Sequence, residues 1–199
     1  MPPLTRIELL RHGEPAGGKR YRGQLDDPLS DTGWQQMWDS VRQTAQDWDL
    51  VVSSPLRRCR AFAERLARKL ELQFEVDAGF KEIGFGAWEG LSAAQIDAQQ
   101  LQRFYQDPLR NSPPGAEHVR DFSTRIGDAW HRLVTRHAGR RLLLVCHAGV
   151  IRALYVQLLR LELQAMFRLP VGYAQRETIV LDAAGALVRS SFAAISASR

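Results

Sequence analysis

Two short, largely apolar runs that each end in a histidine constrain the fold of this chain most strongly. Residues 7–13 read IELLRHG, and residues 142–149 read LLLVCHAG. Runs of this length that stop at polar or small residues are typical of buried strands. In open α/β sheets, ligands bind outside the carboxyl ends of the strands. We therefore expect His12 and His147 to meet at one edge of a sheet and to form a single composite site.

The rest of the chain alternates between strand patterns and helix patterns. Further strands are expected at 50–54, 74–77, 178–182 and 186–191, and helices at 30–47, 56–70, 92–105, 117–137, 149–160 and 164–169. This order predicts a single α/β domain over residues 1–199. We expect a three-layer α/β/α sandwich with a mostly parallel central sheet and helices on both faces. Ser92 is expected to cap the helix that it opens.

Composition limits the class of protein. Hydrophobic residues make up 45% and charged residues 25%, as in soluble globular proteins. No apolar run approaches the ~20 residues of a membrane span, and the first residues lack a signal-peptide layout, so we expect a cytoplasmic protein with no membrane partner. Two cysteines, Cys59 and Cys146, are too few for a disulfide framework or a zinc cage. The net charge of +5 is spread without a sustained basic run, so we expect no nucleic-acid partner.

Arginines cluster at the start of the helix expected over 56–70. Arg57, Arg58 and Arg60 all fall in its first turn, where positive charge opposes the helix dipole unless an anion compensates it. Arg58 is the favoured ligand for such an anion, because it lies one turn beyond a strand end. For Arg57 and Arg60, a solvated surface position is an equally good interpretation.

A carboxylate is expected from segment 80–90, which is rich in glycine and aromatic residues and suits a rigid mount. Glu82 and Glu89 are the two candidates, and either could instead be a surface charge. We favour Glu82 because it lies nearer to the preceding strand end.

These residue types together suit phosphoryl transfer. A neutral His12 can attack phosphorus and form a phosphohistidine. Arg11 and Arg58 offer planar guanidinium groups for phosphate oxygens, and His147 can donate to the transferring group. Glu82 can protonate the departing oxygen and then activate the water that cleaves the intermediate. We expect no metal and no other cofactor, because the cationic side chains supply the positive charge.

Six motifs in this order resemble those of the histidine phosphatase (phosphoglycerate mutase-like) superfamily. They are LLRHGEP at 9–15, RGQLDDPLSDTGWQQ at 22–36, SSPLRRCRAFAE at 53–64, FKEIGFGAWEG at 80–90, PPGAEHVRDFSTR at 113–125 and LLLVCHAGVIRAL at 142–154. The resemblance implies a phosphoglycerate mutase-like fold, with His12 as phosphoacceptor, Glu82 as proton donor, and Arg11, Arg58 and His147 as the phosphate pocket. The other residues expected to contact the substrate are Gly13, Arg22, Gly23 and Ala148.

Within this superfamily, the N-terminal motifs are most similar to those of proteobacterial α-ribazole phosphatases. That similarity implies removal of the 5′-phosphate from α-ribazole phosphate in cobalamin biosynthesis. The alternatives are a broad-specificity or sugar-phosphate phosphatase, a phosphoglycerate mutase, and a non-catalytic module that binds a phospho-ligand. Two positions depart from the family pattern, Pro15 and Ala116, and the second lies where the leaving group is expected.

We expect a small phosphorylated substrate and a monomer or homodimer. His118, in the loop over 107–118, either contacts that substrate or is a solvated residue at a helix start.

Overall fold

The computed structural model describes residues 3–42 and 47–192, and every structural statement below refers to these residues. The strands are β1 (Thr5–Arg11), β2 (Leu50–Ser53), β3 (Gln73–Val76), β4 (Arg141–Cys146), β5 (Arg176–Leu181) and β6 (Leu187–Ser190). The α-helices are α1 (Asp31–Arg42), α2 (Arg57–Lys69), α3 (Ala98–Gln106), α4 (Val119–Arg136) and α5 (Ala148–Leu158). Short 3₁₀ helices are η1 (Ala78–Phe80), η2 (Gly86–Trp88), η3 (Ala93–Gln95) and η4 (Leu163–Arg168).

The six strands form one sheet in the order β3-β2-β4-β1-β5-β6, and the first four of these are parallel. Strand β5 runs antiparallel to β1, and β6 antiparallel to β5. Arg11 at the end of β1 is directly opposite Cys146 at the end of β4, and the His12 N–H donates to the Cys146 carbonyl at 3.0 Å. This register brings the residues that follow both strands to the same edge of the sheet.

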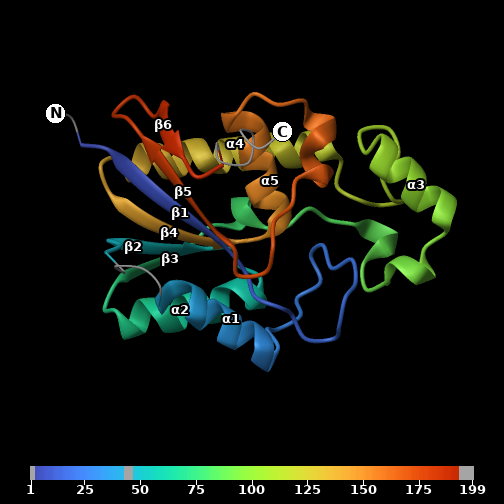
Figure 1. Cartoon of the computed structure of the whole chain (residues 1–199), viewed down its shortest axis with the longest axis horizontal. Coiled ribbons are helices and arrows are strands. Elements are labelled where there is room, and N and C mark those ends of the chain that lie inside the picture. The colour runs from blue at the N-terminus through green and yellow to red at the C-terminus, as the bar shows by residue number, and fades with distance from the viewer. Residues whose placement is uncertain (1–2, 43–46, 193–199) are drawn as a thin grey trace.

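Helices cover both faces of the sheet (Figure 1), as expected for an α/β sandwich. Ile7, Leu9 and Leu144 pack with α4 and α5 in one hydrophobic cluster. Leu10 and Leu143, which point to the opposite face, pack with α1 and α2 in a second cluster. Because side chains alternate along a strand, a strand buried on both faces is apolar throughout its length, and this explains the apolar runs in the sequence.

The order of strands and α-helices follows the sequence expectation, with two corrections. Helix α1 is described as far as Arg42, and Asp47, where the helix was expected to end, is not helical; residues 43–46 lie outside the described residues. The expected single helix over 92–105 is wrong. A reciprocal capping box between Ser92 and Gln95 caps the N-terminus of the short η3 only. The Asp97 carboxylate then accepts from the Gln100 N–H at 2.9 Å and starts α3 as a separate helix.

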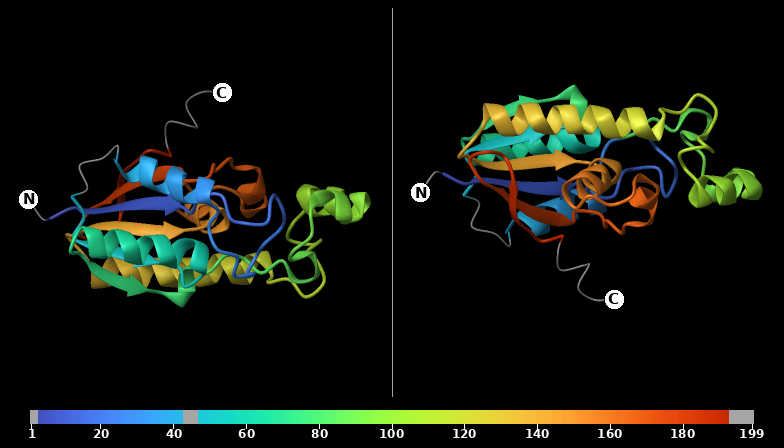
Figure 2. Two further views of the ribbon diagram at one scale, coloured as in Figure 1. Left: turned by 90° about the horizontal axis from the view of Figure 1, so that it is seen from below. Right: turned by 90° about the horizontal axis from the view of Figure 1, so that it is seen from above.

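Helix α3 lies beyond the end of the sheet, as both views of Figure 2 show. It is held there by a small third cluster centred on Trp88, Ile96 and Phe104. The segment from η2 to α3 therefore forms a cap next to the edge where β1 and β4 end.

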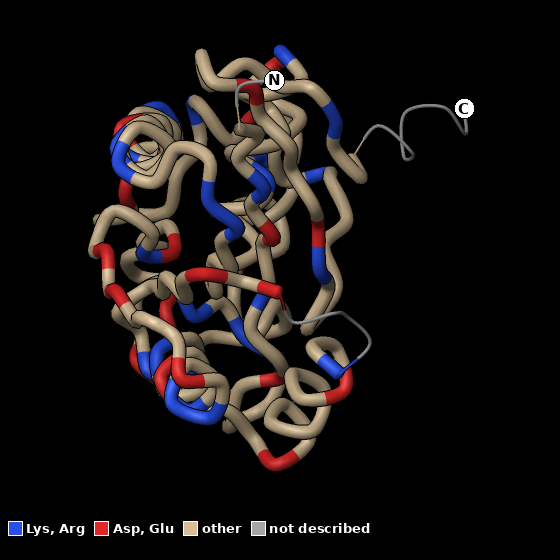
Figure 3. Tube along the Cα trace, turned by 90° about the vertical axis from the view of Figure 1, so that its left-hand side faces the viewer, with Lys and Arg blue, Asp and Glu red and all other residues tan. Residues whose placement is uncertain are grey.

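Charges of both signs are mixed along the chain on the side shown in Figure 3. Several charged side chains of the described residues pair, for example Arg141 with Asp49 at 2.6 Å and Arg125 with Glu117 at 2.7 Å. Among the described residues, no helix has both the length and the apolar character needed to cross a bilayer.

Candidate active site

One pocket of about 210 Å³ opens where β1 and β4 end. It is lined by Arg11, His12, Pro15, Arg20, Tyr21, Arg22, Gly23, Arg58, Glu82, Phe85, Phe104, Tyr105, Ala148, Arg152, Phe167 and Tyr173. Seven of the nine site residues expected from sequence are in this set. His147 lies directly behind it, fully buried, with its ring centroid 5.2 Å from that of His12. Gly13 does not line the pocket.

His12 is held with one ring nitrogen free. Its Nδ1 lies 2.7 Å from the carbonyl oxygen of Gly13. A carbonyl can only accept, so Nδ1 carries the proton and donates, and Nε2 keeps its lone pair. Burial, together with the charges of Arg58 and Arg11, holds the pKa of His12 well below its usual value. The ring is therefore neutral, which a nitrogen nucleophile requires.

His147 is fixed by the end of β2. Its Nε2 lies 2.7 Å from the hydroxyl oxygen of Ser54, and this oxygen accepts from the Leu56 N–H at 3.4 Å. That arrangement favours donation by the Ser54 hydroxyl to Nε2, which leaves the ring proton of His147 on Nδ1. Burial, and then the charges of Arg58 and His12, hold the pKa of His147 well below its usual value.

Arg58 is a buried charge without a protein counterion. Its side chain is 1% exposed, and its guanidinium donates to the carbonyls of Leu25 at 2.6 Å and Gly23 at 2.7 Å. Its Nε has no hydrogen-bond partner, and the partners of its other nitrogens among the described residues are backbone carbonyls and not carboxylates. Burying an unpaired charge costs several kcal/mol, so this position is suited to an anion that enters the pocket.

The neighbouring arginines on α2 differ from Arg58. Arg57 and Arg60 are both exposed, which agrees with the surface interpretation. The Asp26 carboxylate accepts from the Arg57 N–H at 2.6 Å, so a protein anion already compensates the start of α2.

Two further arginines of the pocket have no carboxylate partner among the described residues. Arg11 donates to the Val171 carbonyl at 2.6 Å, and its guanidinium lies 4.1 Å from the ring centre of Tyr173. Arg152 donates through Nε to the Leu169 carbonyl at 2.7 Å. Burial lowers the pKa of both guanidinium groups from the usual value, as expected for cations held partly out of water.

Arg20 and Arg22, in contrast, serve the loop that follows β1. Both pair with Asp27, at 2.8 Å and 3.0 Å. Arg22 also donates to the carbonyls of Ala16 and Gly18. Although Arg22 lines the pocket, as expected from sequence, most of its donors hold the loop in shape.

Glu82 is the one carboxylate among the described residues that line the pocket. Its Oε2 accepts from the Gly149 N–H at 3.1 Å, and its Oε1 accepts from the Ile83 N–H at 3.0 Å. The first turn of α5, whose amides could bind an anion, thus holds this carboxylate at Gly149. Glu89 accepts from the amides of Gln24 and Phe85 outside the pocket, so the structure places Glu82, and not Glu89, near His12.

The loop that carries Glu82 is clamped by two residues that sequence reasoning did not single out. Arg125 forms two hydrogen bonds to the Glu117 carboxylate, at 2.9 Å and 2.7 Å. It also donates to the carbonyls of Gly79 at 2.8 Å and Lys81 at 3.1 Å, immediately before Glu82. Glu117 and Arg125 both lie in the PPGAEHVRDFSTR motif, which therefore supports the mount of the carboxylate.

Packing explains two of the expected glycines, and His118 lies outside the pocket. A Cβ at Gly13 would lie 2.2 Å from the Gly33 carbonyl oxygen, so its lack of a side chain allows contact with α1. A Cβ at Gly23 (φ +51°) would lie 2.1 Å from Glu89 Oε1, although Gly23 also lines the pocket. His118 is exposed at the start of α4 and is not among the pocket-lining residues.

Sequence reasoning missed Arg152, Tyr173 and a group of aromatic residues. Arg152 lies four residues after Ala148 on α5, so helical spacing could have placed it on the pocket side. Tyr173 reaches the site from the loop before β5, which no local pattern indicates. The aromatic residues come from separate segments: Tyr21, Phe85, Phe104, Tyr105 and Phe167. Within the described part of the chain, no group of three or more His, Cys, Asp and Glu residues could hold a metal ion.

Comparison with known proteins agrees with this geometry. The sequence model of a protein family, the histidine phosphatase superfamily (branch 1), matches residues 7–192. The bifunctional protein Rv2228c of Mycobacterium tuberculosis is 35% identical over 193 residues, which cover 92% of this chain and 52% of that protein. The chain thus spans about half the length of this relative.

Two phosphatases resemble the chain over most of their own length. Glucosyl-3-phosphoglycerate phosphatase of Mycolicibacterium vanbaalenii is 33% identical over 170 residues, covering 79% of this chain and 76% of that protein. Among solved structures, the α-ribazole phosphatase of Shigella flexneri superposes with a TM-score of 0.81 at 25% identity, covering 92% of this chain and 94% of the other.

Proposed function

The chain belongs to the histidine phosphatase superfamily, and we propose that it hydrolyses phosphate monoesters through a phosphohistidine formed on His12. One observation carries this proposal. A neutral imidazole with a free Nε2 lies in a pocket that also holds Glu82 and three arginines without a carboxylate partner among the described residues, Arg11, Arg58 and Arg152. A dianionic phosphate would compensate the positive charge that the fold leaves unpaired.

In the first step, His12 Nε2 attacks phosphorus, and the bond between phosphorus and the ester oxygen breaks. Arg11 and Arg58 bind the equatorial oxygens, and the Nδ1–H of His147 donates to the same group as its charge redistributes. Glu82, in its protonated form, gives its proton to the departing oxygen, so the alcohol leaves neutral.

In the second step, the Glu82 carboxylate accepts a proton from a water molecule that attacks the phosphohistidine. The N–P bond breaks, Nε2 recovers its lone pair, and inorganic phosphate leaves. Glu82 is then protonated again and ready for the next ester. The backbone amides of Gly149 and Ile83 hold this carboxylate beside the pocket throughout.

Two substrate classes are proposed. The sequence motifs favour α-ribazole 5′-phosphate, and the solved α-ribazole phosphatase with the same fold supports this class. The 33% identity to a glucosyl-3-phosphoglycerate phosphatase supports a sugar-linked phosphate ester instead. The values of kcat/KM on a panel that contains both classes, together with 3-phosphoglycerate to test for mutase activity, distinguish these substrates.

Hydrolysis of p-nitrophenyl phosphate by wild type and by His12→Ala tests the reaction itself. We expect turnover by wild type, the same turnover after treatment with EDTA, and none by the variant at an unchanged melting temperature. A folded wild-type protein that binds phosphate but turns over no ester would contradict the proposal and favour a non-catalytic module. Loss of activity with EDTA, restored by a metal, would contradict the metal-independent route.

A further inference from the structure

Large apolar side chains that remain exposed on the surface are few. Among the described residues they are Leu4, Val76, Tyr105, Leu161, Tyr173 and Val188, each 36–57% exposed. The two aromatic members of this set, Tyr105 and Tyr173, both line the pocket, and the four aliphatic members lie outside it. Exposed aromatic rings inside a concave site mark a surface that a ligand can cover.

Tyr105 is fixed from two sides although the residue is 45% exposed. Its hydroxyl lies 2.8 Å from the hydroxyl of Tyr21, which belongs to the loop after β1. Its ring packs edge-on against Phe104, with centroids 5.3 Å apart. The ring therefore presents a preorganised apolar surface on α3.

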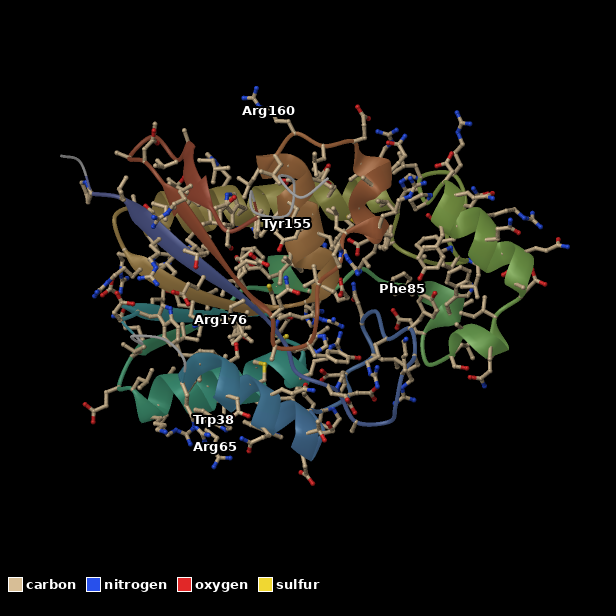
Figure 4. All side chains as sticks on the ribbon, viewed as in Figure 1. Trp38, Arg65, Phe85, Tyr155, Arg160 and Arg176 are labelled. Atoms are coloured by element: carbon tan, nitrogen blue, oxygen red, sulfur yellow. The ribbon has the colours of Figure 1, made fainter. Side chains whose placement is uncertain are left out.

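Tyr173 lies at the end of the pocket where phosphate is expected. Its ring centroid is 6.0 Å from that of His12 and 4.1 Å from the Arg11 guanidinium carbon. Phe85, labelled in Figure 4, lies between the strand ends and α3. Its centroid is 5.3 Å from that of Tyr21, whose hydroxyl contacts Tyr105, so aromatic residues join Phe85 to Tyr105 along the lining of the same pocket.

Resting on the proposed function, we infer that the leaving group of the substrate carries a flat ring, which lies against Tyr105 while the phosphate is bound at His12. Tyr173 then covers the part of the ester next to the phosphate. A straight-chain leaving group would leave the Tyr105 ring exposed. The face of an aromatic heterocycle is flat and apolar, and the C–H face of a sugar ring is also apolar, so either ring can pack on Tyr105.

Matched esters test this inference. The ratio of kcat/KM for 2-phenylethyl phosphate to kcat/KM for n-butyl phosphate is measured for wild type, Tyr105→Phe and Tyr105→Ala. We expect this ratio to exceed one in wild type, to persist in Tyr105→Phe, and to fall about 5- to 10-fold in Tyr105→Ala, mainly through KM, as loss of one ring contact predicts. Leu161→Ala, at a similarly exposed site outside the pocket, is the matched control and keeps the wild-type ratio.

The outcomes separate this inference from the proposed function. If wild type hydrolyses neither of these esters nor p-nitrophenyl phosphate, both are overturned. If it hydrolyses p-nitrophenyl phosphate but neither matched ester, only the inference is overturned. If it hydrolyses both esters with equal efficiency, or if Tyr105→Ala keeps the wild-type ratio, only the inference is overturned. A fall in Tyr105→Phe as large as in Tyr105→Ala also overturns it, because the hydroxyl bond to Tyr21, and not the ring, would then be responsible. Applying the same variants to α-ribazole 5′-phosphate and glucose 6-phosphate identifies the kind of ring by the larger loss.

Discussion

Replacing Gly149 by alanine changes the position of the Glu82 carboxylate without removing any group of the site. A Cβ at position 149 would lie 2.1 Å from Glu82 Oε1, so the carboxylate must move by about 1.3 Å to reach the 3.4 Å of ordinary contact. It would also lose its 3.1 Å hydrogen bond from the Gly149 N–H. A displacement of ~1 Å can lower a rate about 100-fold. We expect a loss of this size in kcat on n-butyl phosphate.

The same substitution should leave the fold stable. Gly149 lies in the first turn of α5, and alanine is the better helix former by up to about 1 kcal/mol. We therefore expect the melting temperature to change by no more than about 4 °C. Gly127→Ala is the matched control, since its Cβ would meet only the end of the Gln157 side chain, at 3.1 Å, and full activity is expected.

Comparison of two esters gives the decisive assay. The nitrophenolate of p-nitrophenyl phosphate leaves without a proton, so Gly149→Ala should lose much less activity on this ester than on n-butyl phosphate. Full activity on both esters would refute the geometric argument. Equal losses on both would refute the role of Glu82 as a proton donor, and a large fall in melting temperature would show general damage instead.

Three further predictions follow from the same contacts. Phosphate should raise the melting temperature of wild type but not of Arg58→Ala, because Arg58 lacks a protein counterion; an equal rise in both would contradict this. The free energy of unfolding should fall as the pH drops below about 6.5, because His12 and His147 have lowered pKa values in the folded protein and take up protons when it unfolds. With two such histidines, the slope should approach about 2.7 kcal/mol per pH unit. Urea titrations should show a smaller slope for His12→Gln, and an unchanged slope would count against the neutral ring. Arg125→Met should lower the free energy of unfolding by about 2 kcal/mol and reduce kcat on n-butyl phosphate, because the hydrogen bonds between Arg125 and Glu117 are lost. An unchanged urea unfolding curve together with an unchanged kcat would show that these hydrogen bonds do not support Glu82.

The arrangement of the strands could be predicted because the apolar pattern within each run agrees with the position of that strand in the sheet. The apolar runs before His12 and His147 can be buried on both faces only in the interior of a sheet that helices cover on both sides, and the helices between them set the parallel crossovers. Residues that follow the ends of neighbouring strands must then be close together. Arg58 follows the same logic, because it lies just after β2.

The remaining features depend on contacts between distant segments, which no local pattern contains. The sequence assigns the space beside Gly13 to a ligand, whereas the Gly33 backbone occupies it. The Gly149 amide at the start of α5 is occupied by Glu82, 67 residues earlier in the chain. Tyr173 reaches Arg11 from the far end of the sequence. The helix break at Asp97 had a local signal, since aspartate is a strong N-cap residue, but the apolar spacing of 92–105 concealed it.

Chemical trapping of the intermediate tests the central claim most directly. Wild type is mixed with a rapidly hydrolysed ester and quenched in alkali, and the phosphorylated peptide is mapped by mass spectrometry and ³¹P NMR. Because the Nδ1 of His12 donates to the Gly13 carbonyl, we expect an acid-labile phosphoryl group on Nε2 of His12. A phosphoryl group on any other residue, or steady hydrolysis with no phosphoenzyme at any time, would contradict the account.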